Sequence, residues 1–442
     1  MRILSEELAG AFTRPTFIRF VALVLAAILT VGSRTVSNMV RTVRNLIPGH
    51  VSSYNRVFSQ RRWSTWAVAH GLCKLLLKHL VPMGTVHLAG DDTVDEHRGA
   101  KVFGKDRHRD AVHSSRSFTA FYWGHKWVVL SIVVRLPFSR RPWALPVLLA
   151  LYRSRKWNQN HGRIHRTQPE ILESLLKVLI RWFPDRCFRL SADGGFGTHR
   201  MACFSSSHRD QLIFVSRFYP DANLYEPCPA RMGKKNGRPR LKGPKALSPE
   251  QVVEQTQVRT RMTVNWYGGE KRDVEIVSAV GHWFKQGQGL VPIRWVFVHD
   301  LTGTHRDEYF FTTRVHMPPR FIVEAYTERW AIEVTFEEAR AYLGFGSTRC
   351  HSEKAVLREA PFLLWLYSII VLLYVLLPTG KQARIFVHWQ GKNVVTFSDV
   401  ITGLRRWLWV HWAFAKVTRN KGYQKLSLPF KNMLLDALAP AA

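Results

Sequence analysis

An uncharged apolar stretch of about 18 residues, Ala360 to Leu377, most restricts how this chain can fold. Such a stretch either crosses a bilayer or forms a helix that the rest of the protein covers on all sides. Basic segments lie before and after it, and they suit a protein that binds a polyanion better than a membrane protein. We therefore expect a helix buried in a large α/β core. The membrane-protein alternative rests on this stretch alone.

The charge of the chain indicates a polyanionic partner. Its 442 residues include 64 Lys and Arg but only 32 Asp and Glu, which gives a formal net charge of +32. The acidic groups of the protein cannot neutralise this excess, whereas each phosphate paired with a cation releases counterions and favours binding. We therefore expect a nucleic acid as the partner. An anionic membrane surface and a ribosomal-type structural role are the alternatives.

Composition and cysteine usage limit the class of protein further. With 46% apolar and 22% charged residues, the chain has the composition of a folded protein, and its length predicts two to four domains. The cysteines are odd in number, widely spaced and without a Cys-x-x-Cys pair; they are Cys73, Cys187, Cys203, Cys228 and Cys350. This pattern is evidence against a disulfide framework and against a structural zinc site, and it predicts a cytoplasmic protein.

The character of the sequence changes near Thr85. Residues 1–80 read as helical and contain eleven Lys or Arg but only two acidic residues, which predicts a basic DNA-binding region. Beyond Thr85, short apolar runs bounded by Gly, Pro and Asp predict strands. These runs are Val86–Gly90, Trp127–Leu136, Leu145–Tyr152, Cys187–Ala192 and Gln211–Arg217. A capping box from Thr167 to Glu170 predicts a helix between the third and fourth runs.

Two further segments differ in composition from this core. Residues 218–314 contain β-like runs and predict a β-rich insertion. Within it, Pro229 to Lys245 carries seven Lys or Arg and no acid, so we expect a flexible basic arm. Arg238 and Arg240 lie there in a Gly-Arg-Pro-Arg sequence similar to the minor-groove element called an AT-hook, although such sequences are also common in solvated loops. Residues 376–442 form a basic C-terminal region.

Three aspartates follow predicted strands and are candidates for chemistry. Asp91 and Asp92 come directly after the first run, and Asp193 comes after the fourth and precedes two glycines. The carboxyl ends of strands in an open α/β sheet are where sites form, and neighbouring carboxylates there bind Mg²⁺ or Mn²⁺. Each aspartate also has an ordinary explanation as a turn residue or helix N-cap.

The segment from Tyr326 to Arg340 gathers charged residues on one side of a predicted helix. At about 100° per residue, Arg329, Glu333 and Arg340 lie at about 300°, 340° and 320° from Tyr326. A separate apolar stripe runs beside them and packs on the sheet; it consists of Ile332, Phe336, Ala339 and Leu343. A helix that is merely solvated explains the charges but not an aromatic ring and two cations around one glutamate.

This helix resembles the Tyr-x2-Arg-x3-Glu-x6-Lys signature of bacterial insertion-sequence transposases of the DDE type, whose catalytic core is ribonuclease H-like. The match holds at Tyr326, Arg329 and Glu333, and Arg340 stands where that family has Lys. The family also has an Asp before Thr after its first strand and a second Asp after a later strand. Asp92, which precedes Thr93, and Asp193 are similar to these two, and Asp91 stays open as an alternative to Asp92.

The resemblance implies an α/β fold with a ribonuclease H-like core over residues 81–375, interrupted by the β-rich insertion and flanked by helical basic regions. It also implies cut-and-paste transposition of an insertion sequence, in which Asp92, Asp193 and Glu333 bind two Mg²⁺ or Mn²⁺ ions. DNA contacts would come from Tyr326, Arg329 and Arg340, and from Trp295 or Tyr309 if a flipped base is held.

The implied partners are the terminal inverted repeats of the element and its target DNA, with a homodimer on the DNA and no membrane. The implied location is the bacterial cytoplasm, in association with the nucleoid. A metal-dependent nuclease or junction resolvase is an alternative with the same chemistry. A catalytically inactive DNA-binding descendant of a transposase is an alternative of another class.

Overall fold

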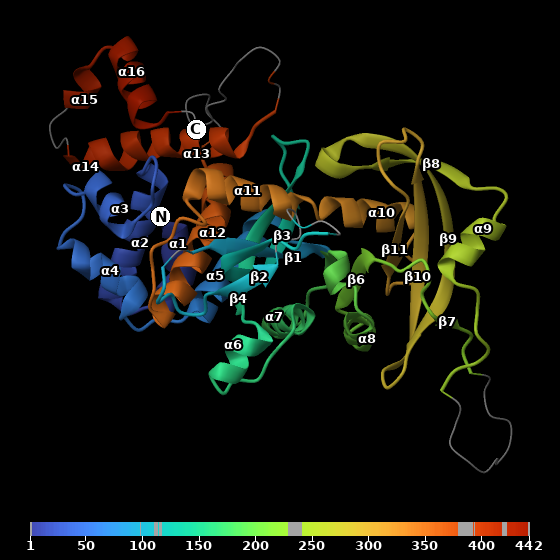
Figure 1. The fold of residues 1–442 in the computed structure, drawn as a ribbon. Coiled ribbons are helices and arrows are strands. Elements are labelled where there is room, and N and C mark those ends of the chain that lie inside the picture. Colours follow the sequence, from blue (N-terminus) through green and yellow to red (C-terminus); the bar gives the residue numbers. More distant parts are fainter. Residues whose placement is uncertain are drawn as a thin grey trace.

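The computed structural model describes residues 2–97, 99–109, 114, 117–228, 241–378, 392, 394–417 and 422–440. Within them, a mixed sheet of eleven strands runs through the molecule and helices cover it (Figure 1). The predicted mixed α/β class is therefore confirmed. The domain boundaries inferred from composition stay a prediction.

Five strands form the part of the sheet that bears the candidate site. Their order is β4-β3-β1-β5-β6, with β3 antiparallel to both β1 and β4. The pairs β1–β5 and β5–β6 are parallel. This order and these directions are those of a ribonuclease H-like sheet. The strands are β1 (Val86–Glu96), β3 (Phe121–Arg135), β4 (Pro142–Tyr152), β5 (Phe188–Ala192) and β6 (Leu212–Arg217), and β2 (Asp106–Arg109) pairs with the start of β3.

The β-rich insertion continues this sheet instead of forming a separate one. Strand β11 pairs antiparallel with β6, and the order then runs β11-β10-β9-β7 with β8 on β9. These strands occupy the right half of Figure 1. Their bounds are β7 (Leu224–Tyr225), β8 (Thr260–Asn265), β9 (Lys271–Lys285), β10 (Gly289–Asp300) and β11 (Glu308–Thr312), with α9 (Pro249–Gln255) between β7 and β8.

Helices lie on both faces of the five-strand part. In Figure 1, α7 and α8 lie below the sheet, and α10 and α11 lie above it. The predicted capping box is present at the start of α7, with Thr167 and Glu170 bonded reciprocally. The bounds are α6 (Arg155–Asn160), α7 (Gln168–Trp182), α8 (His199–Ser207), α10 (Pro319–Glu328), α11 (Ala331–Leu343) and α12 (Glu353–Val375).

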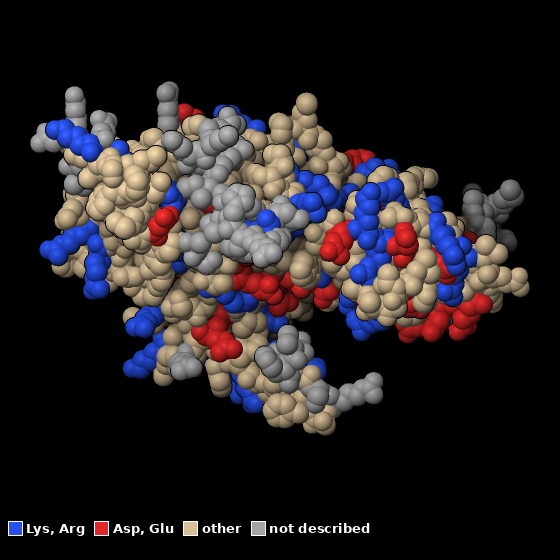
Figure 2. Space-filling view, turned by 90° about the horizontal axis from the view of Figure 1, so that it is seen from above, with Lys and Arg blue, Asp and Glu red and all other residues tan. Residues whose placement is uncertain are grey.

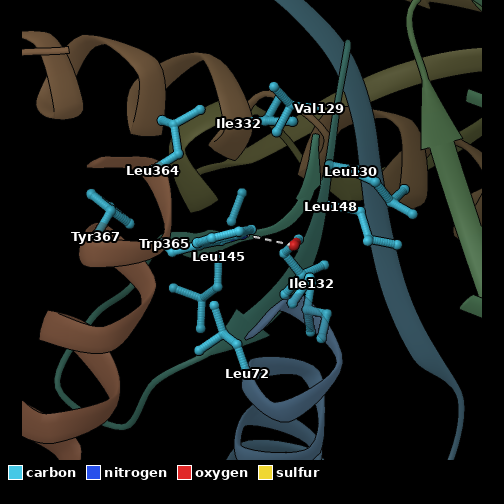
Figure 3. Close-up of a cluster of buried hydrophobic side chains, with 14 of the residues drawn as sticks. Leu72, Val129, Leu130, Ile132, Leu145, Leu148, Ile332, Leu364, Trp365 and Tyr367 are labelled. Carbon is cyan, nitrogen blue, oxygen red and sulfur yellow. Dashed lines mark hydrogen bonds between the residues drawn. The ribbon is translucent and has the colours of Figure 1, made fainter. Parts of the chain in front are cut away.

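Helix α12 contains the uncharged stretch and lies in the core. By length and composition it is the one helix among the described residues that could cross a membrane, but 89% of its most apolar window is buried inside the protein. Trp365 packs among leucine, isoleucine and valine side chains from α5 and the sheet, and its Nε1 donates to the carbonyl oxygen of Val147 at 2.9 Å (Figure 3). The helix is thus buried as expected, and the absence of a membrane partner stays a prediction.

The N-terminal and C-terminal helices pack together beside α12, on the left of Figure 1. The apolar side chains of the N-terminal helices and of the first C-terminal helix belong to the same continuous core as the sheet. The N-terminal helices are α1 (Arg2–Leu8), α2 (Arg14–Leu29), α3 (Val36–Thr42), α4 (Val51–Ser59) and α5 (Thr65–Leu80). The C-terminal helices are α13 (Phe397–Leu408), α14 (Ala415–Val417), α15 (Gly422–Lys425) and α16 (Leu428–Leu438).

Several arginines of this helical part face inward. Arg34 and Arg405 are nearly fully buried, and they donate to the carbonyl oxygens of Ala27 and Ile28 at the end of α2, at 2.9 and 2.7 Å. Arg358 donates to the carbonyl oxygen of Phe58 at the end of α4, at 3.0 Å. These carbonyls lack partners within their helices. Part of the basic excess therefore stabilises the fold and is not available to a polyanion.

Candidate active site

Three carboxylates converge on the guanidinium group of Arg329. Its Nη1 lies 2.5 Å from Oδ2 of Asp91, and its Nη2 lies 2.8 Å from Oε1 of Glu333. The same Nη2 lies 4.0 Å from Oδ1 of Asp193. The side chain of Arg329 is only 6% exposed, whereas those of Asp193 and Glu333 are 42% and 44% exposed. Arg329 thus lies on the buried side of the cluster, and Asp193 and Glu333 lie on the side that is open to solvent.

The strand register explains why Asp91 and Asp193 are neighbours. Parallel pairing of β1 with β5 joins Val86–Gly90 to Phe188–Ala192 and then stops. Asp91 and Asp193 are the next residues on the two strands, so both lie at the carboxyl end of this pair. Strand β1 itself does not end at Gly90 as predicted, because its antiparallel pairing with β3 continues to Glu96.

The helix that carries Glu333 is broken where we expected one continuous helix. Helix α10 ends at Glu328 and α11 begins at Ala331. At the junction, the backbone N–H groups of Arg329 and Trp330 donate to carbonyls three residues earlier, which tightens the turn. The predicted apolar stripe is nevertheless buried against the sheet, at Ile332, Phe336, Ala339 and Leu343. Arg329 and Glu333 therefore still project toward the same strand ends.

Asp92 points away from this cluster. Adjacent residues of a strand project to opposite faces, and Oδ2 of Asp92 lies 3.0 Å from Nζ of Lys126 on β3. Asp92 still borders a surface cavity that Glu333 and Arg340 also line. Of the two aspartates that the sequence left open, the geometry groups Asp91 with Asp193 and Glu333.

The electrostatics differ among the carboxylates. Burial raises the pKa of Asp91 to about 7, although the charge of Arg329 opposes the shift. For Asp193, burial is outweighed by the charge of Arg329 and a hydrogen bond from the backbone of Gly194, so its pKa is lowered. Burial alone would lower the pKa of Arg329, but Asp91 and the other nearby groups raise it. Arg329 is thus a permanent cation at the point where the carboxylates meet.

The donor set fits a divalent cation of the magnesium class. Carboxylate oxygens from two strand ends and a helix are the ligands that Mg²⁺ and Mn²⁺ prefer. A guanidinium already lies among these oxygens, so the cluster stabilises positive charge at this place. Asp91, Asp193 and Glu333 are the residues that would hold such ions.

Tyr326 supports this cluster from within the protein. Its ring is fully buried and stacks on Phe310 with 4.4 Å between ring centroids. Its hydroxyl donates to Oδ1 of Asp193 at 3.1 Å. The structure therefore places Tyr326 behind Asp193, where it fixes the carboxylate, and no face of the ring is open to DNA.

Replacing Tyr326 with Phe should lower metal-dependent DNA cleavage about fivefold. The variant loses one hydrogen bond to Asp193, worth about 1 kcal/mol, while the buried ring and its stacking stay. Cleavage rates at saturating Mn²⁺ measure the effect. Tyr342→Phe on α11 is the matched control and should cleave at the wild-type rate. An unchanged rate in Tyr326→Phe would show that the hydrogen bond does not position Asp193.

A comparison with protein-family models identifies the family of this chain. The family model described as DDE superfamily endonuclease matches residues 7–273, which is more than half of the chain. The chain belongs to the DDE superfamily endonuclease family. The match includes Asp91, Asp92 and Asp193 but ends before Tyr326, so the narrower Tyr-Arg-Glu-Lys group stays a prediction.

Other comparisons add little to this assignment. No curated protein matches the chain. Among solved structures, the chain is similar to the piggyBac transposase in a synaptic complex with hairpin DNA, with a TM-score of 0.43 and 12% sequence identity. The alignment covers 97% of this chain and 77% of that one. The two structures are too dissimilar for the likeness to support a conclusion about this chain.

The last cation of the predicted signature, Arg340, is exposed in this DDE endonuclease family member. Its Nη2 donates to Oγ1 of Thr93 and to the carbonyl oxygen of Val94 on β1. Two N–H donors of the planar guanidinium group of Arg340 are thus used within the protein. A lysine ammonium at this position would offer its donors in a different geometry. Arg340 borders the same cavity as Glu333.

The structure corrects the assignment of Trp295 to DNA. Its side chain is 1% exposed and belongs to the main hydrophobic core, because β10 is covered on the face to which Trp295 points. A base cannot stack on it. Tyr309, the other aromatic candidate, is half-buried and packs on Phe297. Arg238 and Arg240 lie outside the described residues.

Sequence reasoning missed three charged residues that form ion pairs on these strands and helices. Lys126 pairs with Asp92, and Arg217 pairs with Glu308 at 2.5 Å beside Asp193. Glu328 is buried at the end of α10 and accepts hydrogen bonds from Arg135 on β3 and Arg189 on β5. Only Glu328 had a signal, because it is an acid within the Tyr326–Glu333 motif.

Proposed function

We propose that this protein is a DNA transposase that moves an insertion sequence by a cut-and-paste reaction. The convergence of Asp91, Asp193 and Glu333 on one cation carries the proposal. Membership of the DDE superfamily endonuclease family supports the class of chemistry. We assign the first metal-binding carboxylate to Asp91 in place of Asp92, since Asp92 pairs with Lys126 on the other face of β1.

The residues of the cluster have different roles in the proposed reaction. Asp91, Asp193 and Glu333 would hold two Mg²⁺ or Mn²⁺ ions, and such ions would supply activation of the attacking hydroxyl and stabilisation of the leaving oxygen of an in-line displacement at phosphorus. Tyr326 orients Asp193 through its hydroxyl. Arg329 neutralises the buried charge of Asp91 and directs its guanidinium to the strand ends, where a phosphate oxygen would lie.

Double-stranded DNA is the proposed substrate and partner. Lys and Arg side chains are spread over both the helical and the strand-rich parts of the face in Figure 2, and groups of Asp and Glu lie near the middle of the face and on its strand-rich part. A duplex contacts such a surface mainly through its phosphates. We further propose a homodimer on the DNA, because two element ends are cut together, and a cytoplasmic location at the nucleoid.

The proposal is tested with DNA that carries the ends of the element that encodes the protein. Wild-type protein with Mg²⁺ should cut at the ends and join them to a target plasmid, and the Asp193→Asn variant should do neither. Cleavage without joining would identify a nuclease or resolvase instead. Tight binding without any metal-dependent cleavage would identify a DNA-binding descendant and would contradict the proposal.

A further inference from the structure

A second group of metal-binding side chains lies farther along β1, apart from the three carboxylates. Asp95 is on β1, His97 follows the end of β1, and His125 is the residue of β3 directly opposite Asp95. One ligand atom from each of the three lies within 4.8 Å of the others. Asp95 and His125 are 1% exposed and His97 is 6% exposed. The group is therefore enclosed, unlike Asp193 and Glu333.

These buried polar atoms are not satisfied by the described part of the protein. Both carboxylate oxygens of Asp95, Nε2 of His97 and Nδ1 of His125 have no hydrogen-bond partner among the described residues. Oδ2 of Asp95 lies 3.2 Å from Nε2 of His97, but the contact is not aligned as a hydrogen bond. The other ring nitrogen of His125, Nε2, contacts the carbonyl oxygen of Phe103 at 2.8 Å. Leaving such groups without partners is costly, and a cation removes that cost.

A second buried acid lies near this group. Glu359 on α12 is 7% exposed, and its Oε2 also lacks a hydrogen-bond partner among the described residues. Burial raises the pKa of Glu359, and the charges of Asp95 and His97 also act on it, which indicates that the three side chains are near one another. Gly346, between α11 and α12, passes so near that a Cβ atom there would lie 3.9 Å from Oδ1 of Asp95. Strands β1 and β3 and helix α12 thus all contribute polar groups to one enclosed space.

We propose that Asp95, His97 and His125 bind one structural Zn²⁺ ion, with Glu359 as the candidate fourth ligand of a tetrahedral set. The site is separate from the catalytic carboxylates and does not depend on the proposed transposase activity. The cysteine pattern is evidence against a zinc site built from cysteines, and it has no bearing on a site built from histidine and carboxylate.

Chemistry and geometry favour zinc over magnesium here. Two imidazole nitrogens and a carboxylate oxygen suit Zn²⁺, whereas Mg²⁺ prefers an all-oxygen shell and keeps several waters. With metal–ligand distances of about 2.0–2.2 Å, tetrahedral ligands lie about 3.5 Å apart. Small side-chain rotations from the present separations reach this spacing.

The bound ion would join the far half of β1 to β3 and α12. Asp91 lies four residues before Asp95 on the same face of β1. Between the two sites, Arg340 contacts Thr93 and Val94 of the same strand. The ion would therefore stiffen the strand that positions Asp91. We expect its loss to lower the stability of the protein more than it changes the rate of DNA cleavage.

Metal analysis of the purified full chain tests the proposal. Wild-type protein grown with zinc, then gel-filtered in the presence of Mg²⁺, should retain about one Zn²⁺ per chain. The variant with His97→Asn and His125→Asn should retain almost none. Asp193→Asn, which alters the catalytic cluster, and His199→Asn, which removes a buried histidine bonded to Trp283 and Gln288, should both retain the ion.

A second measurement covers the case in which the double variant does not fold. Wild-type protein stripped of zinc and titrated with Co²⁺ should develop the visible absorption of tetrahedral cobalt, and added Zn²⁺ should abolish it. Wild-type protein that holds no more zinc than the double variant, or that shows no such absorption, would overturn the proposal. Equal loss of zinc in Asp193→Asn would assign the ion to the catalytic cluster instead.

Discussion

Asp193→Asn, Glu333→Gln and Asp91→Asn should each reduce metal-dependent DNA cleavage by about 10³-fold or more. Each change removes one of the carboxylates that meet at Arg329, and an amide oxygen binds Mg²⁺ far less strongly than a carboxylate does. Because the three act as one unit, a double variant should be scarcely worse than a single one. Single-turnover cleavage of end-containing DNA at saturating Mg²⁺ measures the rates, and a DNA-binding assay verifies that each variant still binds.

Asp92→Asn is the matched control, since it changes the adjacent residue of the same strand. Its partner is Lys126, so we expect cleavage within about tenfold of wild type. The result to look for is a wide gap between the two neighbouring variants. If Asp92→Asn abolishes cleavage and Asp91→Asn does not, the original assignment of Asp92 from the family resemblance is right and the assignment to Asp91 is wrong.

Glu328→Gln should lower the free energy of unfolding by about 3 kcal/mol at pH 7. Glu328 receives hydrogen bonds from Arg135 and Arg189 and lies 3.3 Å from Nδ1 of His87. Burial on its own would raise the pKa of Glu328, but the hydrogen bond with His87 and the charge of Arg189 outweigh it and lower the pKa to about 2. The neutral variant leaves two arginines without this acid. Urea unfolding followed by circular dichroism measures the change.

The pH dependence of this difference has a definite sign. An acid whose pKa is lower in the folded state stabilises the protein fully above its unfolded pKa, here 4.5, and loses that effect as the pH falls toward about 2. The gap between wild type and Glu328→Gln should therefore narrow below pH 4.5. Glu353→Gln, which breaks an exposed pair with Arg163 at 3.5 Å, should cost less than about 1 kcal/mol. A gap that stays constant at low pH would exclude this electrostatic origin.

The periodicity of the sequence predicts the architecture well. Short apolar runs and a capping box place β4, β5, β6 and the start of α7 within three residues of their observed bounds, whereas the end of β1 and the start of β3 each lie six residues beyond the predicted run. The apolar stripe Ile332, Phe336, Ala339 and Leu343 is buried, because a period of 3.6 residues identifies the packed face of a helix without tertiary information. The uncharged stretch is the core helix α12 for the same reason.

Strand register and the packing of helices against the sheet decide which side chains lie together. The periodicity of the sequence contains information about neither. Asp91 and Asp92 are certain to point to opposite faces, but only the packing of α11 decides which face is the site. Trp295 was misassigned because a strand covered on both faces cannot be recognised from the strand alone. His97 and His125 meet through the antiparallel pairing of β1 with β3, and no local sequence pattern reveals that pairing.

Continuity of the sheet limits how this molecule can respond to a long ligand. Backbone hydrogen bonds between β11 and β6 join the insertion to the five-strand part of the sheet. Strand β6 in turn pairs with β5, the strand that precedes Asp193. Backbone pairing of this kind resists bending, so the two halves of the molecule in Figure 1 are not expected to close around a duplex by a hinge motion. Dyes placed on the two halves should therefore keep a constant separation when DNA binds, and fluorescence energy transfer between them measures it.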